Sequence, residues 1–432
     1  MEILAEVGEL APPDIDVEVE VKSQSITKAE PRTNLGHVCV MGLGYIGLPT
    51  ASMLANRGYS VAGVDVSSDV VNTINRGEIH IVEPDLDMMV RSAVNAGSLT
   101  ASLKPEAADV FVIAVPTPFK SDKKPDLSYV LAATKMISKY LVPGNLVILE
   151  STSPPGTTDE VVAETLREHG HAVGTDVFVA HCPERVLPGK ILIELIENDR
   201  VVGGVNEASA NKAVDFYETF VRGDVIATTA KTAELVKLTE NSSRDVQIAF
   251  ANEISMICDQ ENLNAWEVIE LANKHPRVNI LNPGPGVGGH CIAVDPWFIV
   301  DRAPACSNLI RTAREVNDAK PKWVVNRIRE NAFKFKKATI ACLGLSFKAD
   351  VDDLRESPAF SIYKAIQAEN LGEVIVCEPN LTSHTDVTLH SLEHCISQAD
   401  IVVVLVDHKI FRKLSAEQLK EKVVIDTRGI VK

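Results

Sequence analysis

One short stretch near the beginning constrains the fold more than any other part of the chain. The apolar run "HVCVM" leads directly into "GLGYIG", where Gly42, Gly44 and Gly47 are spaced as G-x-G-x-x-G, and the helical pattern "PTASMLANRG" follows. A strand that turns tightly into a helix uses the first glycine for the turn, the second for approach of the main chain to a pyrophosphate, and the third for close packing. The helix N-terminus then faces the anion. The pattern predicts a dinucleotide site, whose turn also contains Tyr45 and Ile46.

The second predicted strand, "YSVAGVDV", supplies an acidic residue for the same site. Asp65 lies near its end, 18 residues after Gly47. A carboxylate there can bind both ribose hydroxyls and would repel a 2′-phosphate, so the sequence predicts NAD rather than NADP. Thr117 and Thr152 end later strands, in "VPTP" and "STSPPGTT". We expect them to lie along the cofactor cleft or, alternatively, to be simple turn residues.

Short apolar segments alternate with helical ones over two long parts of the chain. The runs "ADVFVIAVPTP", "LVILES" and "DVFVAHCPE" continue the first set, and "KATIACLGLSF", "GEVIVCEP", "ADIVVVLV" and "KVVIDTRG" form a second set near the C-terminus. Between them, residues 229–273 have helical spacing and predict a long helix and a shorter one. Such alternation predicts parallel strands with crossover helices. The fold class expected is α/β, with two Rossmann-like domains of parallel-rich sheets joined by a long central helix.

We predict four segments along the chain. Residues 1–33 form an acidic mobile extension or, alternatively, a docked strand; residues 34–228 form the NAD-binding domain; residues 229–322 form a helical connector; residues 323–432 form a second α/β domain. The apolar positions of the connector form a dimer face or pack against their own domains. These positions are Leu235, Leu238, Ile248, Phe250, Ile254 and Ile257.

The composition excludes several classes of function. With 43 Lys and Arg against 59 Asp and Glu, the formal net charge is −16, which argues against a nucleic-acid partner because phosphate backbones are bound by clustered basic residues. No apolar run reaches the roughly 18 residues of a membrane helix, and the acidic start "MEILAEVGEL" lacks the basic region of a secretory signal. We therefore expect a cytoplasmic protein without a membrane partner. The eight cysteines include no CxxC pair, so no metal site is predicted.

The segment "NPGPGVGGHCIAVDP" is the strongest candidate for a chemical site. Its glycines permit positive φ and close approach of the main chain to a ligand, and they can turn backbone N–H groups toward Cys291. Asp295 lies four residues further on, on the same side if the segment turns helically. A cysteine beside an NAD site suggests aldehyde oxidation, in which a thiolate adds to the carbonyl, hydride leaves and the thioester is hydrolysed. A buried structural cysteine in a tight loop is the alternative.

Two other segments contribute candidate residues. In "AELVKLTEN", Lys237 and Asn241 are four residues apart, so on a helix they share a face and can point at one developing negative charge. The alternative is a solvated lysine and a surface asparagine. Glu184, in "HCPERVLPG", ends a strand and is either a candidate base or an ordinary turn acid.

Five motifs together resemble the nucleotide-sugar 6-dehydrogenases of the UDP-glucose/GDP-mannose dehydrogenase family. They are "GLGYIG", "CPE", "AELVKLTEN", "GPGVGGHC" and "GLSFKADVDDLRESP", in this order and over residues 35–432. The resemblance implies a four-electron, NAD-dependent oxidation of the sugar C6 alcohol to a carboxylate, without release of the aldehyde. It implies that Cys291 is the nucleophile, that Lys237 and Asn241 hold the oxyanion, and that Asp295 assists proton transfer or positions water.

The same resemblance implies further site residues and an assembly. Glu184 and Thr152 would serve as base and water-positioning groups around hydrolysis. It implies that the UDP-sugar is contacted by Arg185, Lys237, Asn241, Arg277, Gly288, Lys348, Arg355 and Arg428. Arg277 looks like an arginine that is often contributed across a dimer interface, so a homodimer or larger homo-oligomer is expected.

Departures from the pattern of the glucose enzymes bear on the sugar. Those enzymes typically have Lys-Asp after the cysteine, where this chain has Val294-Asp295, and "NPEF" where it has "CPERVLPGK". Both departures resemble the branch that acts on N-acetylated sugars. UDP-N-acetyl-D-mannosamine, oxidised to the mannosaminuronate, is favoured over UDP-N-acetyl-D-glucosamine and UDP-glucose, although no residue chemistry reads the configuration at C2. An NAD-binding sensor or scaffold without turnover and a one-step alcohol dehydrogenase are the alternatives from other classes.

Overall fold

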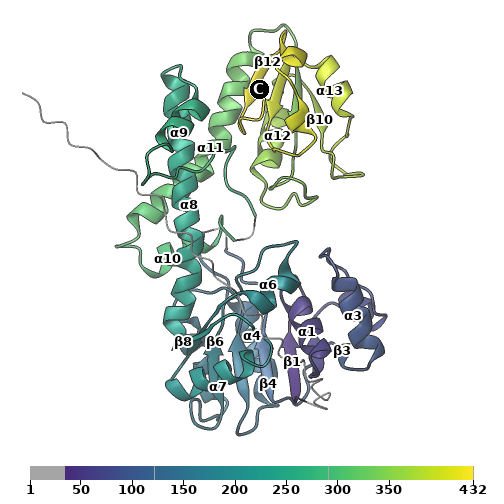
Figure 1. Ribbon diagram of the computed structural model, residues 1–432, viewed down its shortest axis with the longest axis vertical. Helices are drawn as coiled ribbons and strands as arrows, with labels where there is room; N and C mark the ends of the chain where they lie inside the picture. The colour runs from purple at the N-terminus through teal and green to yellow at the C-terminus, as the bar shows by residue number, and fades with distance from the viewer. Residues whose placement is uncertain (1–34, 121, 290, 432) are drawn as a thin grey trace, which may run out of the picture.

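A computed structural model describes residues 35–120, 122–289 and 291–431 of the 432-residue chain (Figure 1). The extension predicted for residues 1–33 lies outside the described residues. Two lobes, each built on its own sheet, lie toward opposite ends of a long helix, α8 (Ala230–Gln260) (Figure 1). This arrangement confirms the predicted fold class, two Rossmann-like α/β domains joined by a long central helix.

The larger sheet belongs to the N-terminal lobe. Its strands are β1 (His37–Met41), β2 (Ser60–Val64), β3 (Leu99–Ser102), β4 (Val110–Ile113), β5 (Leu146–Leu149), β6 (Phe178–His181), β7 (Arg200–Gly204) and β8 (Val225–Thr229). They lie in the order β3-β2-β1-β4-β5-β6-β7-β8, and all neighbours are parallel except β6 and β7. Strands β3, β7 and β8 were not predicted from the sequence. The outer strands β3 ("LTAS") and β8 ("VIATT") mix polar with apolar residues, and β8 is largely exposed, so neither has the continuous apolar run of a buried strand.

Helices cover both faces of this sheet. Because side chains alternate along β1, Val38 and Val40 enter the core on one face, whereas Cys39 and Met41 enter the core on the other. The helices of this lobe are α1 (Gly47–Asn56), α2 (Ser68–Asn75), α3 (Leu86–Asn95), α4 (Ser128–Ser138), the π-helix η1 (Thr158–Ala163), α5 (Glu164–Glu168), α6 (Ile191–Glu197) and α7 (Glu207–Tyr217).

The central region is helical, as predicted. Helix α8 has 31 residues, a length of about 46 Å at 1.5 Å per residue. Its start is capped by Thr229, whose Oγ1 accepts a hydrogen bond from the Thr232 amide at 3.2 Å. It packs against α10 (Asp295–Arg302) and α11 (Asn308–Ala332), and α9 (Ala265–Ala272) follows it. The segment between α9 and α10, which contains Cys291, passes between the two lobes (Figure 1).

The C-terminal lobe has a smaller, fully parallel sheet. Its strands are β9 (Thr339–Leu343), β10 (Glu373–Cys377), β11 (Ile401–Val404) and β12 (Val423–Asp426), in the order β10-β9-β11-β12. Its helices are α12 (Pro358–Ala368) and α13 (Leu392–Gln398), with the 3₁₀ turns η2 (Phe411–Lys413) and η3 (Glu417–Leu419). Because the strands are parallel, the loops after β9 and β11 emerge at the same edge of the sheet, where ligands bind in such folds.

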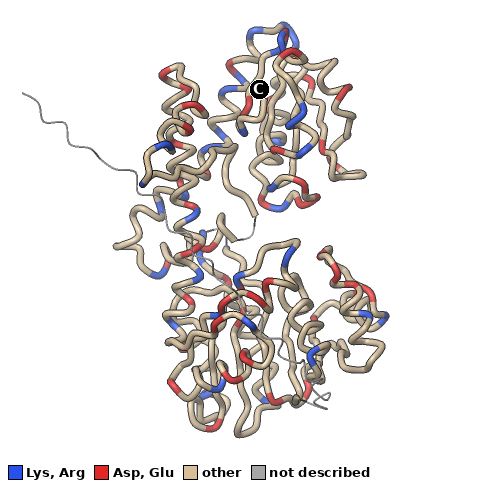
Figure 2. Tube along the Cα trace, in the orientation of Figure 1, with Lys and Arg blue, Asp and Glu red and all other residues tan. Residues whose placement is uncertain are grey.

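Two properties concern the whole described chain. None of its helices combines the length and the apolar character that a membrane span requires. Acidic and basic residues are interspersed along both lobes (Figure 2).

Candidate active site

The dinucleotide loop has the conformation that its glycines predict. Gly42 has φ +93° and donates its N–H to Val64 O at 2.7 Å. A Cβ on Gly47 would lie 1.8 Å from the Gly42 carbonyl oxygen, whereas a Cβ on Gly44 would meet no atom within 4 Å. The third glycine is thus required for folding, and the second leaves open space at the N-terminus of α1. That space fits the pyrophosphate of NAD.

Asp65 has a structural role that the sequence did not indicate. Its Oδ2 accepts from the Leu43 amide at 3.0 Å and its Oδ1 from the Ser67 amide at 2.9 Å. The carboxylate therefore ties the glycine turn to the end of β2, in addition to the ribose contact predicted for it. Thr117 and Thr152 lie together, since Thr117 Oγ1 donates to Thr152 O at 2.6 Å.

The candidate catalytic residues gather where α8 meets α10. Cys291 O accepts from the amides of Val294 at 2.9 Å and Asp295 at 2.8 Å, so the segment does turn helically after the cysteine. Asn241 Nδ2 donates to Asp295 Oδ2 at 2.6 Å. Lys237, one turn earlier on α8, is half-buried and acts electrostatically on both Cys291 and Asp295.

The electrostatics of this group favour a neutral thiol. Burial raises the pKa of Asp295 to about 6, against the hydrogen bond from Asn241 and the charge of Lys237. Desolvation also raises the pKa of the Cys291 thiol, the Asp295 carboxylate raises it further, and Lys237 lowers it. The loop therefore does not by itself stabilise a thiolate. Attack by the sulfur needs a group that takes its proton, and a carboxylate with a pKa near 6 suits that task.

We call the segment "NPGPGVGGHCIAVDP", residues 282–296, the cysteine loop. Its glycines face the C-terminal lobe of the protein. A Cβ on Gly288 would lie 2.4 Å from Glu356 O, and one on Gly289, which has φ +83°, would lie 3.1 Å from the Phe347 ring. From the sequence, these glycines were expected to allow close approach of the main chain to a ligand. The structure shows a further reason, because larger side chains would separate the loop from the lobe against which it packs.

Val294 belongs to the apolar core between two helices. It is 7% exposed and packs with Leu238 and Phe298 in a small apolar cluster between α8 and α10. The residue that favoured an N-acetylated sugar therefore belongs to the packing beneath Lys237 and Asp295.

Glu184 and Arg185 are both ion-paired. Glu184 is buried and accepts from Arg200 Nη1 at 2.9 Å, and Arg185 pairs with Glu240 of α8 at 2.8 Å. Among the described contacts, Glu184 has none with Cys291, so its role as a base stays a prediction.

A buried carboxylate, Glu150, lies in the same charged cluster and was missed by the sequence analysis. Tyr217 donates its hydroxyl to Glu150 Oε1 at 2.7 Å. Burial, with a contribution from Glu184, raises the pKa of Glu150 to about 7, against the charge of Arg200. The only signal in the sequence was its place, directly before "STSPPGTT" at the end of β5.

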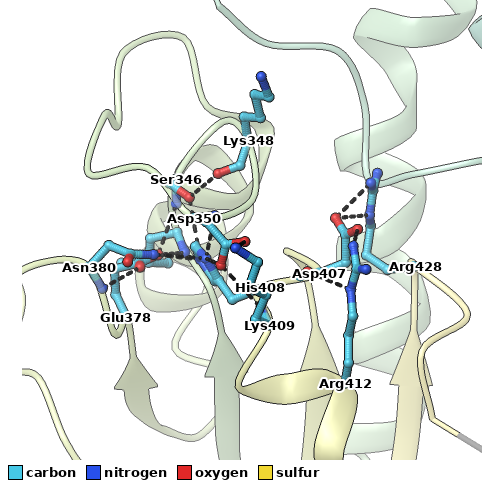
Figure 3. A network of polar contacts seen from close by, with 11 residues as sticks. Ser346, Lys348, Asp350, Glu378, Asn380, Asp407, His408, Lys409, Arg412 and Arg428 are labelled. Carbon is cyan, nitrogen blue, oxygen red and sulfur yellow. Dashed lines mark hydrogen bonds and ion pairs between the residues drawn. The ribbon is translucent and has the colours of Figure 1, made fainter. Parts of the chain in front are cut away.

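In the C-terminal lobe, the loop after β9 is held from below by a Glu–His pair (Figure 3). Glu378 Oε2 accepts from the Leu345 amide at 2.7 Å and from His408 Nε2 at 3.1 Å, and His408 Nδ1 accepts from the Asp350 amide at 2.9 Å. Burial raises the pKa of Glu378, but the hydrogen bonds from His408 and from backbone amides outweigh this and lower it overall. The exposed side chain of Lys348 extends from this loop, away from the buried pair (Figure 3).

Besides Arg185, the other three arginines predicted for the substrate site have different surroundings. Arg355 pairs with Asp353 at 2.6 Å, and its guanidinium lies 5.5 Å from the ring centroid of Tyr45 in the dinucleotide loop. Arg428 pairs with Asp407 at 2.7 Å (Figure 3). Arg277, on the segment after α9, is exposed. The structure thus brings Arg355 to the cofactor loop and leaves Arg277 at the surface.

Comparison with known proteins gives a consistent result. Three models of the UDP-glucose/GDP-mannose dehydrogenase family match the chain: the NAD binding domain at residues 36–221, the central domain at 231–319 and the UDP binding domain at 341–432. An NDP-N-acetyl-D-galactosaminuronic acid dehydrogenase of Ralstonia solanacearum is 57% identical, over 91% of this chain and 96% of the relative. A UDP-N-acetyl-D-mannosamine dehydrogenase of Yersinia pestis is 52% identical, over 91% and 98%.

A solved structure agrees with the sequence comparisons. The UDP-N-acetyl-mannosamine dehydrogenase Cap5O from S. aureus superposes with a TM-score of 0.85 at 45% identity, covering 92% of this chain and 96% of that one. The chain therefore belongs to the UDP-glucose/GDP-mannose dehydrogenase family, whose members are NAD-dependent oxidoreductases of nucleotide sugars.

Proposed function

We propose that this enzyme oxidises the C6 alcohol of UDP-N-acetyl-D-mannosamine to the carboxylate in two NAD-dependent steps, with Cys291 as covalent nucleophile. The observation that carries the proposal is the grouping of Cys291 with Asp295, Asn241 and Lys237 at the junction of α8 and α10. A sensor or scaffold that only bound NAD would have no use for a thiol, a carboxylate, an amide and an amine held together.

NAD, when bound, accepts one hydride in each oxidation step. Once the alcohol has become an aldehyde, Asp295 takes the thiol proton and Cys291 Sγ adds to C6. Lys237 Nζ and Asn241 Nδ2, side by side on α8, hold the oxyanion of the thiohemiacetal. Departure of the second hydride leaves a thioester. One water hydrolyses the thioester and releases the sugar carboxylate. The proton held by Asp295 returns to sulfur, so the free thiol and the Asp295 carboxylate are restored.

The remaining predicted residues are assigned supporting roles. We propose that Thr152 and Glu184 position the hydrolytic water, and that Lys348 and Arg355 approach the UDP-sugar from the C-terminal lobe. The two basic residues are exposed on the edge of the sheet where the loops after β9 and β11 emerge. That edge is where ligands bind in parallel sheets.

The configuration of the sugar has two supported candidates. Relatives named for UDP-N-acetyl-D-mannosamine are 50–52% identical, which supports the mannosamine epimer. The 57% identical relative is named for N-acetyl-D-galactosaminuronic acid, so a galacto-configured substrate is the second candidate. Both candidates are N-acetylhexosamines linked to a nucleoside diphosphate, and the proposed chemistry at C6 is the same for each.

A homodimer is proposed from the exposed apolar residues of the central region. Phe250 is 53% exposed and Ile257 is 49% exposed on α8, whereas Leu238, also predicted as an interface residue, is fully buried. Exposed aromatic and aliphatic side chains on one helix are typical of an interface. Phe250→Asp should therefore lower the mass measured by light scattering, and an unchanged mass would contradict this interface.

One assay tests the substrate and the stoichiometry together. Purified enzyme with excess NAD should yield two NADH for each UDP-N-acetyl-D-mannosamine consumed. UDP-N-acetylgalactosamine, UDP-N-acetylglucosamine and UDP-glucose, run side by side, should be poorer substrates by kcat/KM. One NADH per sugar would indicate a one-step alcohol dehydrogenase, and bound NAD without any NADH would refute enzymatic function with these sugars.

The covalent step has its own test. Cys291→Ser should abolish steady-state turnover while NAD binding stays unchanged, because the cysteine lies outside the dinucleotide loop. Cys306→Ser is the matched control, since Cys306 is the other exposed cysteine. A Cys291→Ser rate close to that of the control would refute covalent catalysis.

A further inference from the structure

A line of buried polar side chains connects α8 and α11 to the start of the cysteine loop. Gly284 donates its N–H to Asn252 Oδ1 at 2.8 Å, and Asn252 Nδ2 donates to Asn317 Oδ1 at 2.8 Å. Asn317 Nδ2 in turn donates to Asp245 Oδ1 at 2.8 Å. Asn252, Asn317 and Asp245 are at most 1% exposed. Apart from the backbone of the loop, these groups belong to no site described above.

The direction of these hydrogen bonds is fixed from one end. Arg314 donates to Asp245 Oδ1 at 2.6 Å, and both residues are buried, so the carboxylate at this end is held by an ion pair. Because a carboxylate only accepts, Asn317 must present its amide nitrogen to Asp245 and its oxygen to Asn252. Asn252 must then present its nitrogen to Asn317, which leaves its oxygen for the N–H of Gly284.

Gly284 of the cysteine loop is also in contact with the C-terminal lobe. An ideal Cβ on Gly284 would lie 2.6 Å from Arg428 Nη1 of the C-terminal lobe. Gly284 is therefore packed against Arg428 on one side and hydrogen-bonded to Asn252 on the other. Seven residues later, the loop delivers Cys291 to the partners that α8 also carries.

Helix α8 carries both the residues expected to act with the thiol, Lys237 and Asn241, and the residue that holds the loop, Asn252. Asn241, which bonds Asp295, is one turn before Asp245, and Asn252 is two turns after Asp245 on the same helix. A rigid helix thus sets the spacing between the residues that face the thiol and the residue that holds the loop. Displacement of about 1 Å at a reacting atom can lower a rate by about 100-fold.

We propose that Asn252 is a positioning residue for the cysteine loop, with its carboxamide oriented by Asn317 and the Asp245–Arg314 pair. The role rests on the proposed function of Cys291 as nucleophile. Asn252 touches neither substrate nor cofactor. It acts by holding Gly284, so that the thiol lies against Lys237 and Asn241.

The test compares three asparagine variants of the full-length enzyme. Asn252→Ala removes the acceptor for Gly284, and Asn317→Ala removes only the group that orients Asn252. Asn331→Ala is the matched control, because Asn331 is also a buried asparagine of α11 but bonds Arg327 O and Lys334. For each variant, kcat and the KM for NAD are measured with UDP-N-acetyl-D-mannosamine or with whichever UDP-sugar proves to be the substrate.

A second measurement follows the thiol itself. The rate of alkylation by iodoacetamide is recorded against pH in a Cys306→Ser background, which removes the other exposed cysteine. A loosened loop reduces the desolvation that raises the pKa of the Cys291 thiol, so Asn252→Ala should alkylate faster at neutral pH while turning over more slowly. A variant that had merely lost stability would not combine these two changes with a normal KM for NAD.

The expected result is a kcat about 10- to 100-fold lower in Asn252→Ala, a smaller loss in Asn317→Ala, and no loss in Asn331→Ala. The KM for NAD should stay within about threefold in all three, because the dinucleotide loop is remote from the network. If Asn252→Ala and Asn331→Ala have equal kcat and equal alkylation rates, the positioning role is refuted. The Cys291→Ser variant separates the two ideas: if it retains turnover, the proposed function fails, and if it is inactive while Asn252→Ala is normal, only the positioning role fails.

Discussion

Replacement of Gly44 by alanine should change protein stability and cofactor affinity in opposite directions. A methyl group at Gly44 would meet no protein atom within 4 Å, and the φ of this residue lies outside the left-handed region. Alanine at such a position restricts the unfolded chain and stabilises the folded state by about 0.4–1 kcal/mol. The space that the methyl group enters is, however, the space assigned to the pyrophosphate. An added methyl in a packed contact costs about 1–3 kcal/mol, which corresponds to a roughly 5- to 150-fold weaker Kd for NAD.

Calorimetry checks both effects on one protein sample. Titration with NAD should give the weaker Kd, and a thermal scan without NAD should give a melting temperature equal to or slightly above that of the wild type. Gly47→Ala is the contrasting variant, because its Cβ would lie 1.8 Å from the Gly42 carbonyl oxygen and the turn could not form. That variant should lose stability and NAD binding together. A Gly44→Ala enzyme that binds NAD within twofold of the wild type would refute the assignment of this space to the pyrophosphate.

Three further predictions concern buried polar groups. Burial raises the pKa of Asp295 in the folded protein from 3.8 to about 6. Stability is therefore lost as the pH rises from about 4 to about 6, by up to about 3 kcal/mol at 1.36 kcal/mol per pKa unit, and stays lost above pH 6. Asp295→Asn should raise the melting temperature at pH 7 but not below pH 4, and equal effects at both pH values would contradict the shift. Glu234→Ala should lower the free energy of unfolding in urea by about 3 kcal/mol or more, at about 1 kcal/mol or more for each unsatisfied donor. The amide and hydroxyl of Thr158, bonded at 2.7 and 2.6 Å, and the amide of Gly156, bonded at 2.5 Å, all lose their acceptor. His408→Asn keeps an acceptor for the Asp350 amide, whereas His408→Gln does not. The KM for the UDP-sugar should therefore rise about tenfold in the Gln variant and less in the Asn variant. Equal KM values would show that the loop after β9 does not depend on the hydrogen bond between Asp350 and His408.

Local patterns predicted much of the fold. The strand, turn and helix around Gly42 and the length of α8 follow from the spacing of apolar residues and from glycine geometry, which act within a few residues of the chain. The outer strands β3 and β8 escaped prediction because their side chains are partly polar. They are strands because the neighbouring strands offer hydrogen-bond partners, and that information is not local.

The candidate site likewise contains residues whose positions follow from local spacing and others whose partners come from distant strands. Lys237 and Asn241 were expected on one helical face, and both act on Asp295, because the spacing of four residues needs only a helix. That Glu184 pairs with Arg200 could not be predicted, since β7 pairs antiparallel with β6 and brings Arg200 from a strand that was itself missed. Tertiary pairing of this kind leaves no periodic trace in a single sequence.

The cysteine loop shows how a motif can be glycine-rich for two reasons at once. Gly286, with φ +143°, has a backbone that other residues rarely adopt, and a Cβ there would lie 3.1 Å from both Pro321 of α11 and Pro358 of α12. Gly288 and Gly289 meet the loop after β9 in the same lobe. The thiol is therefore placed by a segment that contacts the central helices and the C-terminal lobe together. Since the residues proposed to bind the UDP-sugar lie in that lobe, any movement of the lobe against α8 would also move Cys291 relative to Lys237. The contacts of these glycines therefore join the segment that carries the nucleophile to the lobe proposed to hold the substrate.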